Sequence, residues 1–224
     1  MSDWSDLLHS DEIAASEGET YLFETESLIV EFVRIEETIR NLNDYFVICD
    51  RAIGQEIDLL KKLSGAGGVP ESVDPNSEEG WLLKESKWAI DEIQIPELEW
   101  TRRVLESGSR LMMLASCCEH LLCWLVEQHC DKAATRPKQL PQESRVEALW
   151  RVLHERCRGP QQIPSRAAKA IDEMRKIRNE FTHGEWDKLE QRLGQQKFSS
   201  YFDAIREAFD LLESHLAGTI DTGD

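Results

Sequence analysis

The chain has 224 residues, a net charge of −17 and six cysteines, four of them between Cys117 and Cys130. So acidic a balance argues against a protein whose main role is to coat nucleic acid, and the clustered cysteines do not resemble a secreted disulfide framework. The N-terminus is acidic and lacks the apolar segment of a secretory signal, so we expect a cytoplasmic protein. The length allows a substantial core, and we expect one composite domain.

Residues 1–20 form an acidic N-terminus that we expect to be flexible. Apolar residues then recur every three or four positions from Leu28 to Leu60. This spacing predicts one long amphipathic helix, or two helices broken near Gly54. Such a helix can form a coiled-coil-like seam within the bundle, which we favour, or with a second copy. Glycines and prolines over residues 64–80 predict a loop. We therefore expect residues 21–95 to form an N-terminal helical region that contains this loop.

A short helix is expected from Trp81 to Ile95, ending before Pro96 because the residue before a proline disfavours the helical conformation. A longer helix is expected from Glu97 to Asp131, with an inner face formed by Leu98, Leu105, Met112, Ala115, Leu122 and Leu125. Its apolar part is interrupted by Glu119 and His120, which indicates a buried core helix and no membrane span. Six tryptophans are expected to anchor the core: Trp81, Trp88, Trp100, Trp124, Trp150 and Trp186.

Further on, residues 132–141 read as a loop, followed by a helix from Ser144 to Cys157. Ser165 is expected to be the N-cap of the next helix, whose inward side chains would be Ala168, Ile171, Met174, Ile177 and Phe181. Leu189 and Leu193 suggest another helical turn, and a last helix is expected over residues 199–217. Since no segment of useful length alternates with strand periodicity, the chain is predicted to be all-α. Residues 97–217 would form an antiparallel helical bundle.

The cysteines and histidines of residues 117–130 are numerous enough to suggest a metal site. However, Cys117, Cys118 and Cys123 would lie on one continuous helix and point in different directions, whereas zinc sites require paired ligands held by turns. These cysteines are better explained as small core residues. We therefore expect no metal and no cofactor.

One hexapeptide combines a fixed cation, an amide and a titratable imidazole: Arg178-Asn179-Glu180-Phe181-Thr182-His183. Asn179 and His183 are four residues apart and so share one side of a helix, while the long side chain of Arg178 can reach toward the same side. Gly184 follows directly and predicts that the helix ends at His183. An arginine that holds a phosphate and a histidine that moves a proton are the minimum set for cutting RNA without a metal.

The hexapeptide lies in a basic stretch of the acidic chain. Residues 132–184 contain twelve Lys/Arg and six Asp/Glu, a local charge of +6, which leaves −23 for the rest. Arg175 and Lys176, about one turn before the hexapeptide, are therefore candidate substrate-binding residues. An ordinary fluctuation of surface charge is the alternative explanation of this stretch.

These residues resemble the signature of the HEPN family (higher eukaryotes and prokaryotes nucleotide-binding), which is Arg, then Asn, Asp or His, three variable residues and His. The resemblance covers roughly residues 97–217. It implies a helical bundle that forms a homodimer in which two motifs meet. It also implies a metal-independent endoribonuclease of toxin–antitoxin or antiviral defence systems, with Arg178, Asn179 and His183 as catalytic residues. In toxins silenced by nucleotidyl transfer a Tyr stands two residues after the His, where this chain has Glu185.

The sequence therefore supports two hypotheses for the function. The first is an endoribonuclease that acts on an RNA substrate through attack by the ribose 2′-OH, with an antitoxin or regulatory protein as a possible partner. The second is a non-catalytic HEPN-like interaction or ligand-binding module, which acts as a dimer or with a partner protein. The acidic body and the long helix motivate the second.

Overall fold

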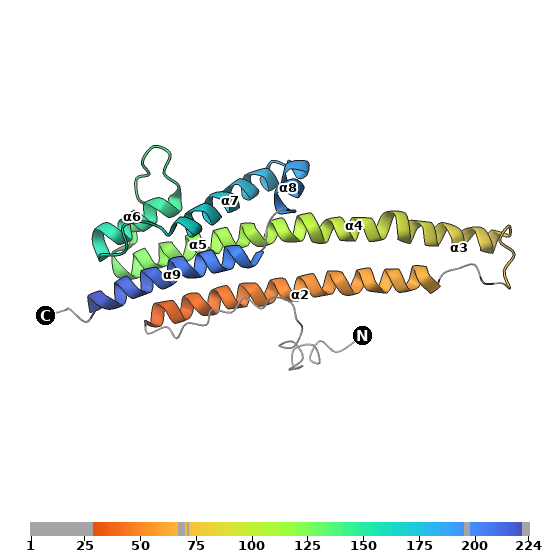
Figure 1. Ribbon diagram of the computed structural model, residues 1–224, viewed down its shortest axis with the longest axis horizontal. Helices are drawn as coiled ribbons and strands as arrows, with labels where there is room; N and C mark the ends of the chain where they lie inside the picture. Colours follow the sequence, from red (N-terminus) through yellow and green to blue (C-terminus); the bar gives the residue numbers. More distant parts are fainter. Residues whose placement is uncertain (1–28, 67–69, 71, 195–197, 221–224) are drawn as a thin grey trace.

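The computed structural model describes residues 29–66, 70, 72–194 and 198–220 (Figure 1). The residues 1–20 expected to be flexible lie outside this part. Every regular element in the described residues is helical, so the all-α prediction is confirmed. The main helices are α2 (Val30–Ala66), α3 (Glu78–Ala89), α4 (Ile95–Trp100), α5 (Ser107–His129), α6 (Arg145–Cys157), α7 (Ser165–Thr182), α8 (Trp186–Leu193) and α9 (Phe198–Ile220).

The long N-terminal helix α2 is continuous over 37 residues, and the break considered near Gly54 is absent. A methyl group added at Gly54 would lie 3.7 Å from the guanidinium of Arg102, an ordinary contact, so this glycine is tolerated within the helix. The helix also runs through Gly65, and α3 starts at Glu78 behind the N-cap Ser77, whose hydroxyl accepts a hydrogen bond from the Gly80 N–H at 3.1 Å. The connecting loop is therefore shorter than the predicted residues 64–80.

The helix break expected before Pro96 was wrong. One helical rod runs from Glu78 to His129 through two π-helical turns, η2 (Ile90–Gln94) and η3 (Thr101–Glu106). At the first of these, the Ile95 N–H donates to the carbonyl of Ile90, five residues back. This wider turn accommodates the ring of Pro96, which has no N–H to donate, so the rod continues.

The two π turns also changed which side of the rod faces the core. Each inserts an extra residue relative to the 3.6-residue repeat, and the apolar face rotates accordingly. Leu105 and Met112 of the predicted face are only partly buried, whereas Val104 and Leu111 are fully buried. Further along α5 the predicted Leu122 and Leu125 are buried, as expected.

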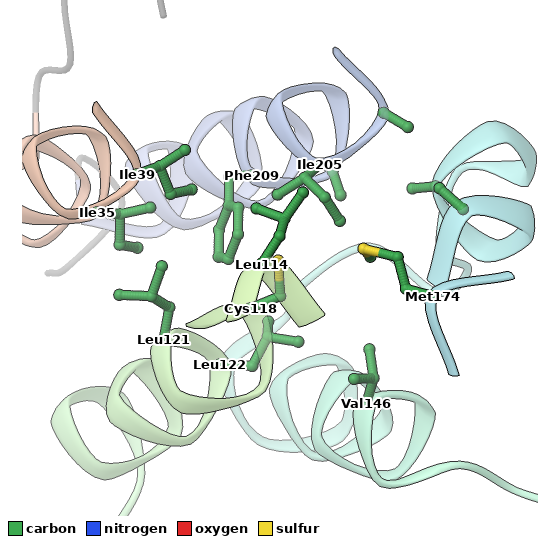
Figure 2. Close-up of a cluster of buried hydrophobic side chains, with 14 of the residues drawn as sticks. Ile35, Ile39, Leu114, Cys118, Leu121, Leu122, Val146, Met174, Ile205 and Phe209 are labelled. Atoms are coloured by element: carbon green, nitrogen blue, oxygen red, sulfur yellow. The ribbon is translucent and has the colours of Figure 1, made fainter. Parts of the chain in front are cut away.

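Two long helical elements set the shape of the molecule, because α2 lies beside the middle of the α3–α5 rod and packs against η2, α4, η3 and α5, while most of α3 extends beyond the end of α2 (Figure 1). Helices α6 and α7 pack against α5, and α9 packs against α7, which together form a bundle around one half of the rod. The core of this bundle takes side chains from α2, α5, α6, α7, α8 and α9. Figure 2 shows a part of it in which these side chains point toward one another: Ile35, Ile39, Leu114, Cys118, Leu121, Leu122, Val146, Met174, Ile205 and Phe209.

The other half of the rod and the end of α2 form a two-helix arm, defined here as residues 53–66 and 78–98. Its small core comprises Ile57, Leu60 and Ile95. Two helices alone cannot cover all of their apolar side chains, so Trp81 and Trp88 are 67% and 57% exposed. The prediction that the tryptophans anchor the core holds for Trp150, but it was wrong for these two and for Trp186, which is 38% exposed.

By length and composition, the rod is apolar enough to cross a membrane, a test that buried core helices also pass. Its apolar residues Leu111, Leu114, Leu121 and Leu125 are buried in the bundle. The next connection is a loop, as predicted for residues 132–141, apart from a short 3-10 turn, η4 (Lys132–Thr135).

Candidate functional site

Helix α7 carries the hexapeptide, and its sides are divided by burial. Ala167, Ala170, Met174 and Ile177 are buried. Of the predicted inward residues, Ala168, Ile171 and Phe181 are only partly buried, because the buried face is rotated slightly from the predicted one. The prediction that Ser165 caps the helix was wrong: Ser165 is already helical, and Pro164 precedes it without a side-chain cap.

The end of α7 is held by the backbone. Gly184 has φ +69°, a conformation that favours glycine. It allows the Gly184 N–H to bond the carbonyl of Phe181 at 3.2 Å and the Glu185 N–H to bond that of Glu180 at 2.9 Å. These two bonds form a Schellman motif, so the backbone of His183 is fixed directly after the last helical residue, as the sequence predicted.

Glu180 is the buried polar residue of the hexapeptide, and its importance was missed from the sequence. Its carboxylate accepts hydrogen bonds from Arg192 of α8 at 2.8 and 2.6 Å. Arg192 also donates to Glu173 at 2.9 Å, so one guanidinium joins two turns of α7 to α8. The bonds from Glu180 raise the pKa of Arg192, and those from Lys176 and Arg192 hold the pKa of Glu173 below its ordinary value.

Phe181 packs the end of α7 against Trp186 of α8 and against Gly108 of the rod. Its ring meets Trp186 edge-on, with the centroids 5.4 Å apart. A methyl group added at Gly108 of α5 would lie 2.8 Å from this ring, which means that only a glycine allows so close an approach. The two neighbours of Phe181 have different surroundings. Glu180 accepts hydrogen bonds from Arg192 of α8, and Thr182 is exposed.

The three predicted catalytic side chains face solvent. Arg178, Asn179 and His183 are all exposed. None of these side chains makes a hydrogen bond or ion pair with another residue in the part of the chain that the structure describes. Their polar atoms are therefore available to a ligand or to a second protein chain.

A cavity of about 280 Å³ lies between α5, α6 and α7, and Arg178 is on its wall. The apolar side chains of Val146 and Met174 contribute to the lining, and two further arginines, Arg145 and Arg175, stand beside Arg178. Asn179 and His183 are not among the residues that line this cavity. Within one chain, then, the cation of the hexapeptide borders a hollow that its imidazole does not.

The arginines of this cavity differ in their partners. Arg145 is paired with Glu119 at 2.9 Å and Arg175 with Asp172 at 2.7 Å. Arg178 has no acidic partner in the described residues. The carboxylates of the cavity wall, Glu119 and Glu143, pair with Arg145 and Arg151. An incoming anion therefore engages Arg178 most easily, because no existing ion pair has to be broken.

The two predicted substrate-binding residues are placed differently. Arg175 is exposed and lines the cavity beside Arg178. Lys176 is turned to other partners: its ammonium bonds Asp172 at 2.9 Å and Glu173 at 2.8 Å, and it does not line the cavity. These carboxylates raise the pKa of Lys176. The structure therefore brings Arg175, but not Lys176, together with Arg178.

Folding neutralises about half of the basic stretch, residues 132–184. Six of its twelve cations form ion pairs: Arg145, Arg151, Arg156, Arg166, Arg175 and Lys176. Three of these pairs use carboxylates from outside the stretch, namely Glu119, Asp131 and Asp203. The other six form no ion pair with a described residue, and these are Lys132, Arg136, Lys138, Arg158, Lys169 and Arg178.

Within the described ranges, no three His, Cys, Asp or Glu side chains are grouped so that they could hold a metal ion. Cys118 is buried in the core and Cys117 and Cys123 are packed against it, as small core residues would be. No family model, curated protein or solved structure was found to match the chain.

Proposed function

We propose that the protein is a metal-independent endoribonuclease of HEPN type, with Arg178 and His183 as its catalytic residues. One observation carries the proposal. Arg178 is the unpaired cation on the wall of a cavity, and an exposed imidazole, also without a partner in the described residues, stands five residues further on at a backbone-fixed helix end. A cation for the phosphate and a base for the hydroxyl are what this reaction requires.

In the proposed reaction, His183 accepts the proton of a ribose 2′-OH as its oxygen attacks the adjacent phosphorus. The bond from phosphorus to the 5′-oxygen of the next nucleotide breaks, and that oxygen takes up a proton from a general acid. The products are a 2′,3′-cyclic phosphate and a 5′-hydroxyl. Arg178 stabilises the extra negative charge on the phosphate oxygens, and Asn179 orients His183 or the substrate.

The proposed site is shared by two copies of the chain. His183 lies away from the cavity that Arg178 borders, so a single chain offers one cation and one imidazole without a common enclosing hollow. A second copy that brings its own hexapeptide to the first would supply both a general acid and a second cation. Specific activity should then fall on dilution below the dissociation constant of the dimer, whereas activity proportional to protein concentration throughout would contradict a shared site.

The test of the nuclease uses single-stranded RNA and purified full-length protein in excess chelator. We expect cleavage by the native protein and a loss of about 100-fold or more in Arg178→Ala, since removal of one group that stabilises transition-state charge costs about this much. Arg136→Ala is the matched control, because Arg136 is an exposed arginine of the same basic stretch that lacks an acidic partner in the described residues. Equal activity of the two variants would contradict the proposal.

A non-catalytic assembly module is the second candidate, and the apolar surface of α2 and the rod favours it. The two-helix arm exposes Trp81 and Trp88. Separately, Tyr45, Met112 and Met113 line an open groove of about 510 Å³ between α2 and α5. Exposed apolar surface of this kind is common where proteins associate. If association is the whole function, the Arg178→Ala, His183→Ala double variant will retain its dimer or partner complex and show no functional loss.

A further inference from the structure

Two cysteines that are far apart in the sequence meet where α5 and α6 end. Cys130 follows the last residue of α5, and Cys157 is the last residue of α6. Their sulfur atoms are 2.7 Å apart. This is within about 1 Å of the length of an S–S bond, ~2.05 Å, although both residues are free thiols here.

We propose that Cys130 and Cys157 form a reversible disulfide when the protein meets an oxidised low-molecular-weight thiol such as glutathione disulfide. One protein thiolate attacks a sulfur of glutathione disulfide, and the other glutathione leaves as a thiolate. The second protein thiolate then attacks the mixed disulfide and releases the remaining glutathione. In total two protein thiols lose two protons and two electrons, and one glutathione disulfide becomes two molecules of glutathione.

The surroundings hold the two helix ends together independently of any covalent bond. The Cys157 thiol also donates to the carbonyl of His129 at 3.6 Å. Close by, Arg156 of α6 pairs with Asp131 beyond the end of α5 at 2.8 Å. Because the fold already brings the sulfurs together, the second step of the exchange is intramolecular and is favoured over attack on the mixed disulfide by free glutathione, which would reverse the first step.

The other cysteines are poorer candidates. No other pair of cysteine sulfurs in the described part of the chain is within hydrogen-bonding distance, and all six cysteines belong to that part. Cys118 is buried in the core, where a disulfide reagent cannot reach it, and burial raises its pKa. Cys130 and Cys157 are both partly exposed, so a small disulfide reagent can reach them.

The reaction should be slow at neutral pH and faster in mild alkali. Burial and the adjacent Cys130 thiol raise the pKa of Cys157 to about 12, which keeps it in the thiol form that does not attack disulfides. Once formed, the bond closes the segment that contains η4 and α6, including Gln139 and Arg145 of the cavity wall. Closing this segment should stabilise the folded protein, because the unfolded chain loses freedom.

The experiment treats full-length native protein with redox buffers of increasing glutathione disulfide to glutathione ratio, followed by alkylation of free thiols and peptide mapping. The expected result is a cross-linked peptide pair containing Cys130 and Cys157 and a melting temperature that rises with the cross-linked fraction. The single variants Cys130→Ser and Cys157→Ser should show no rise. Cys49→Ser, which removes a partly exposed thiol on α2, should behave like the native protein.

Alkylation of both Cys130 and Cys157 at high glutathione disulfide, in protein that circular dichroism shows to be folded, would overturn the proposal. A dominant disulfide between any other two cysteines would overturn it equally. Because the native protein is mapped directly, the test does not depend on whether the serine variants fold. It is also independent of RNA cleavage.

Discussion

Arg192 of α8 donates two hydrogen bonds to Glu180 of α7, which is only 8% exposed and belongs to the hexapeptide that also carries Arg178 and His183. The hexapeptide therefore contains two kinds of residue. Glu180 and Phe181 attach it to α8 and α5, while the remaining polar side chains face outward. The backbone beneath Arg178 and His183 is therefore fixed, while their exposed side chains stay available to a substrate or to a second chain.

Glu180→Gln should lower the free energy of unfolding by about 2 kcal/mol, because it removes the charge that a partly buried guanidinium depends on. Chemical denaturation at neutral pH measures the change. Glu185→Gln is the control, since Glu185 forms an exposed ion pair with Lys188, for which the loss should be below about 1 kcal/mol. Equal losses in the two variants would show that the Glu180–Arg192 contact has no special weight.

Gly184→Ala should destabilise the protein by about 1 kcal/mol, because alanine disfavours the positive φ that ends α7. The added methyl group would meet only Trp186, at 3.7 Å, so the cost arises in the backbone. The measurement is the melting temperature of Gly184→Ala. Gly54→Ala is the control, for which we expect a change in stability of the opposite sign. Gly54 lies within a helix and its replacement should stabilise by up to about 1 kcal/mol; a stabilising Gly184→Ala would be inconsistent with the described turn.

The fold class, and the end of α7 in particular, could be predicted from the sequence because the signals are local. Apolar spacing marks the helices, and Gly184 marks the stop after His183. The continuation through Pro96 could not be predicted, since it depends on a π turn that the adjacent packing of α2 accommodates. The burial of Val104 in place of Leu105 follows from the π turns η2 and η3. The apolar spacing of the sequence does not indicate where these turns occur.

The candidate site was likewise predictable only in part. The spacing of Asn179 and His183 indicates that they share a side, but the cavity beside Arg178 is made by α5 and α6, which are distant in sequence. Arg175 lines the cavity and Lys176 does not, because Lys176 binds the nearby carboxylates of Asp172 and Glu173. The sequence gives only a weak indication of the ion pair between Glu180 and Arg192. The helical repeat places Glu180 on the buried side of α7, where an acidic residue needs a partner.

Stability should fall in acid partly through Asp50, which joins α2 to the rod by accepting two hydrogen bonds from Arg102, both at 2.7 Å. These bonds hold the pKa of Asp50 below its ordinary value of 3.8. A carboxyl with a lowered folded pKa stabilises the fold above its unfolded pKa, and this contribution is lost as the pH falls through the folded pKa.

Asp50→Asn should therefore cost at most about 1 kcal/mol at pH 7, since both partners are more than a third exposed. Its melting temperature should also fall less steeply than that of the native protein between about pH 5 and pH 2. Melting curves across this range make the comparison. Parallel pH profiles for the two proteins would rule out a contribution from Asp50.

The most direct measurement of the central claim is RNA cleavage by His183→Ala in excess chelator, with analysis of the product ends. We expect the native protein to leave 2′,3′-cyclic phosphate and 5′-hydroxyl ends. His183→Ala should lose about 100-fold or more in rate, as for removal of a general acid or base, whereas His120→Ala, which removes another exposed histidine, should retain full rate. Undiminished cleavage by His183→Ala, or no cleavage by the native protein, would contradict the assignment of His183 as a catalytic residue.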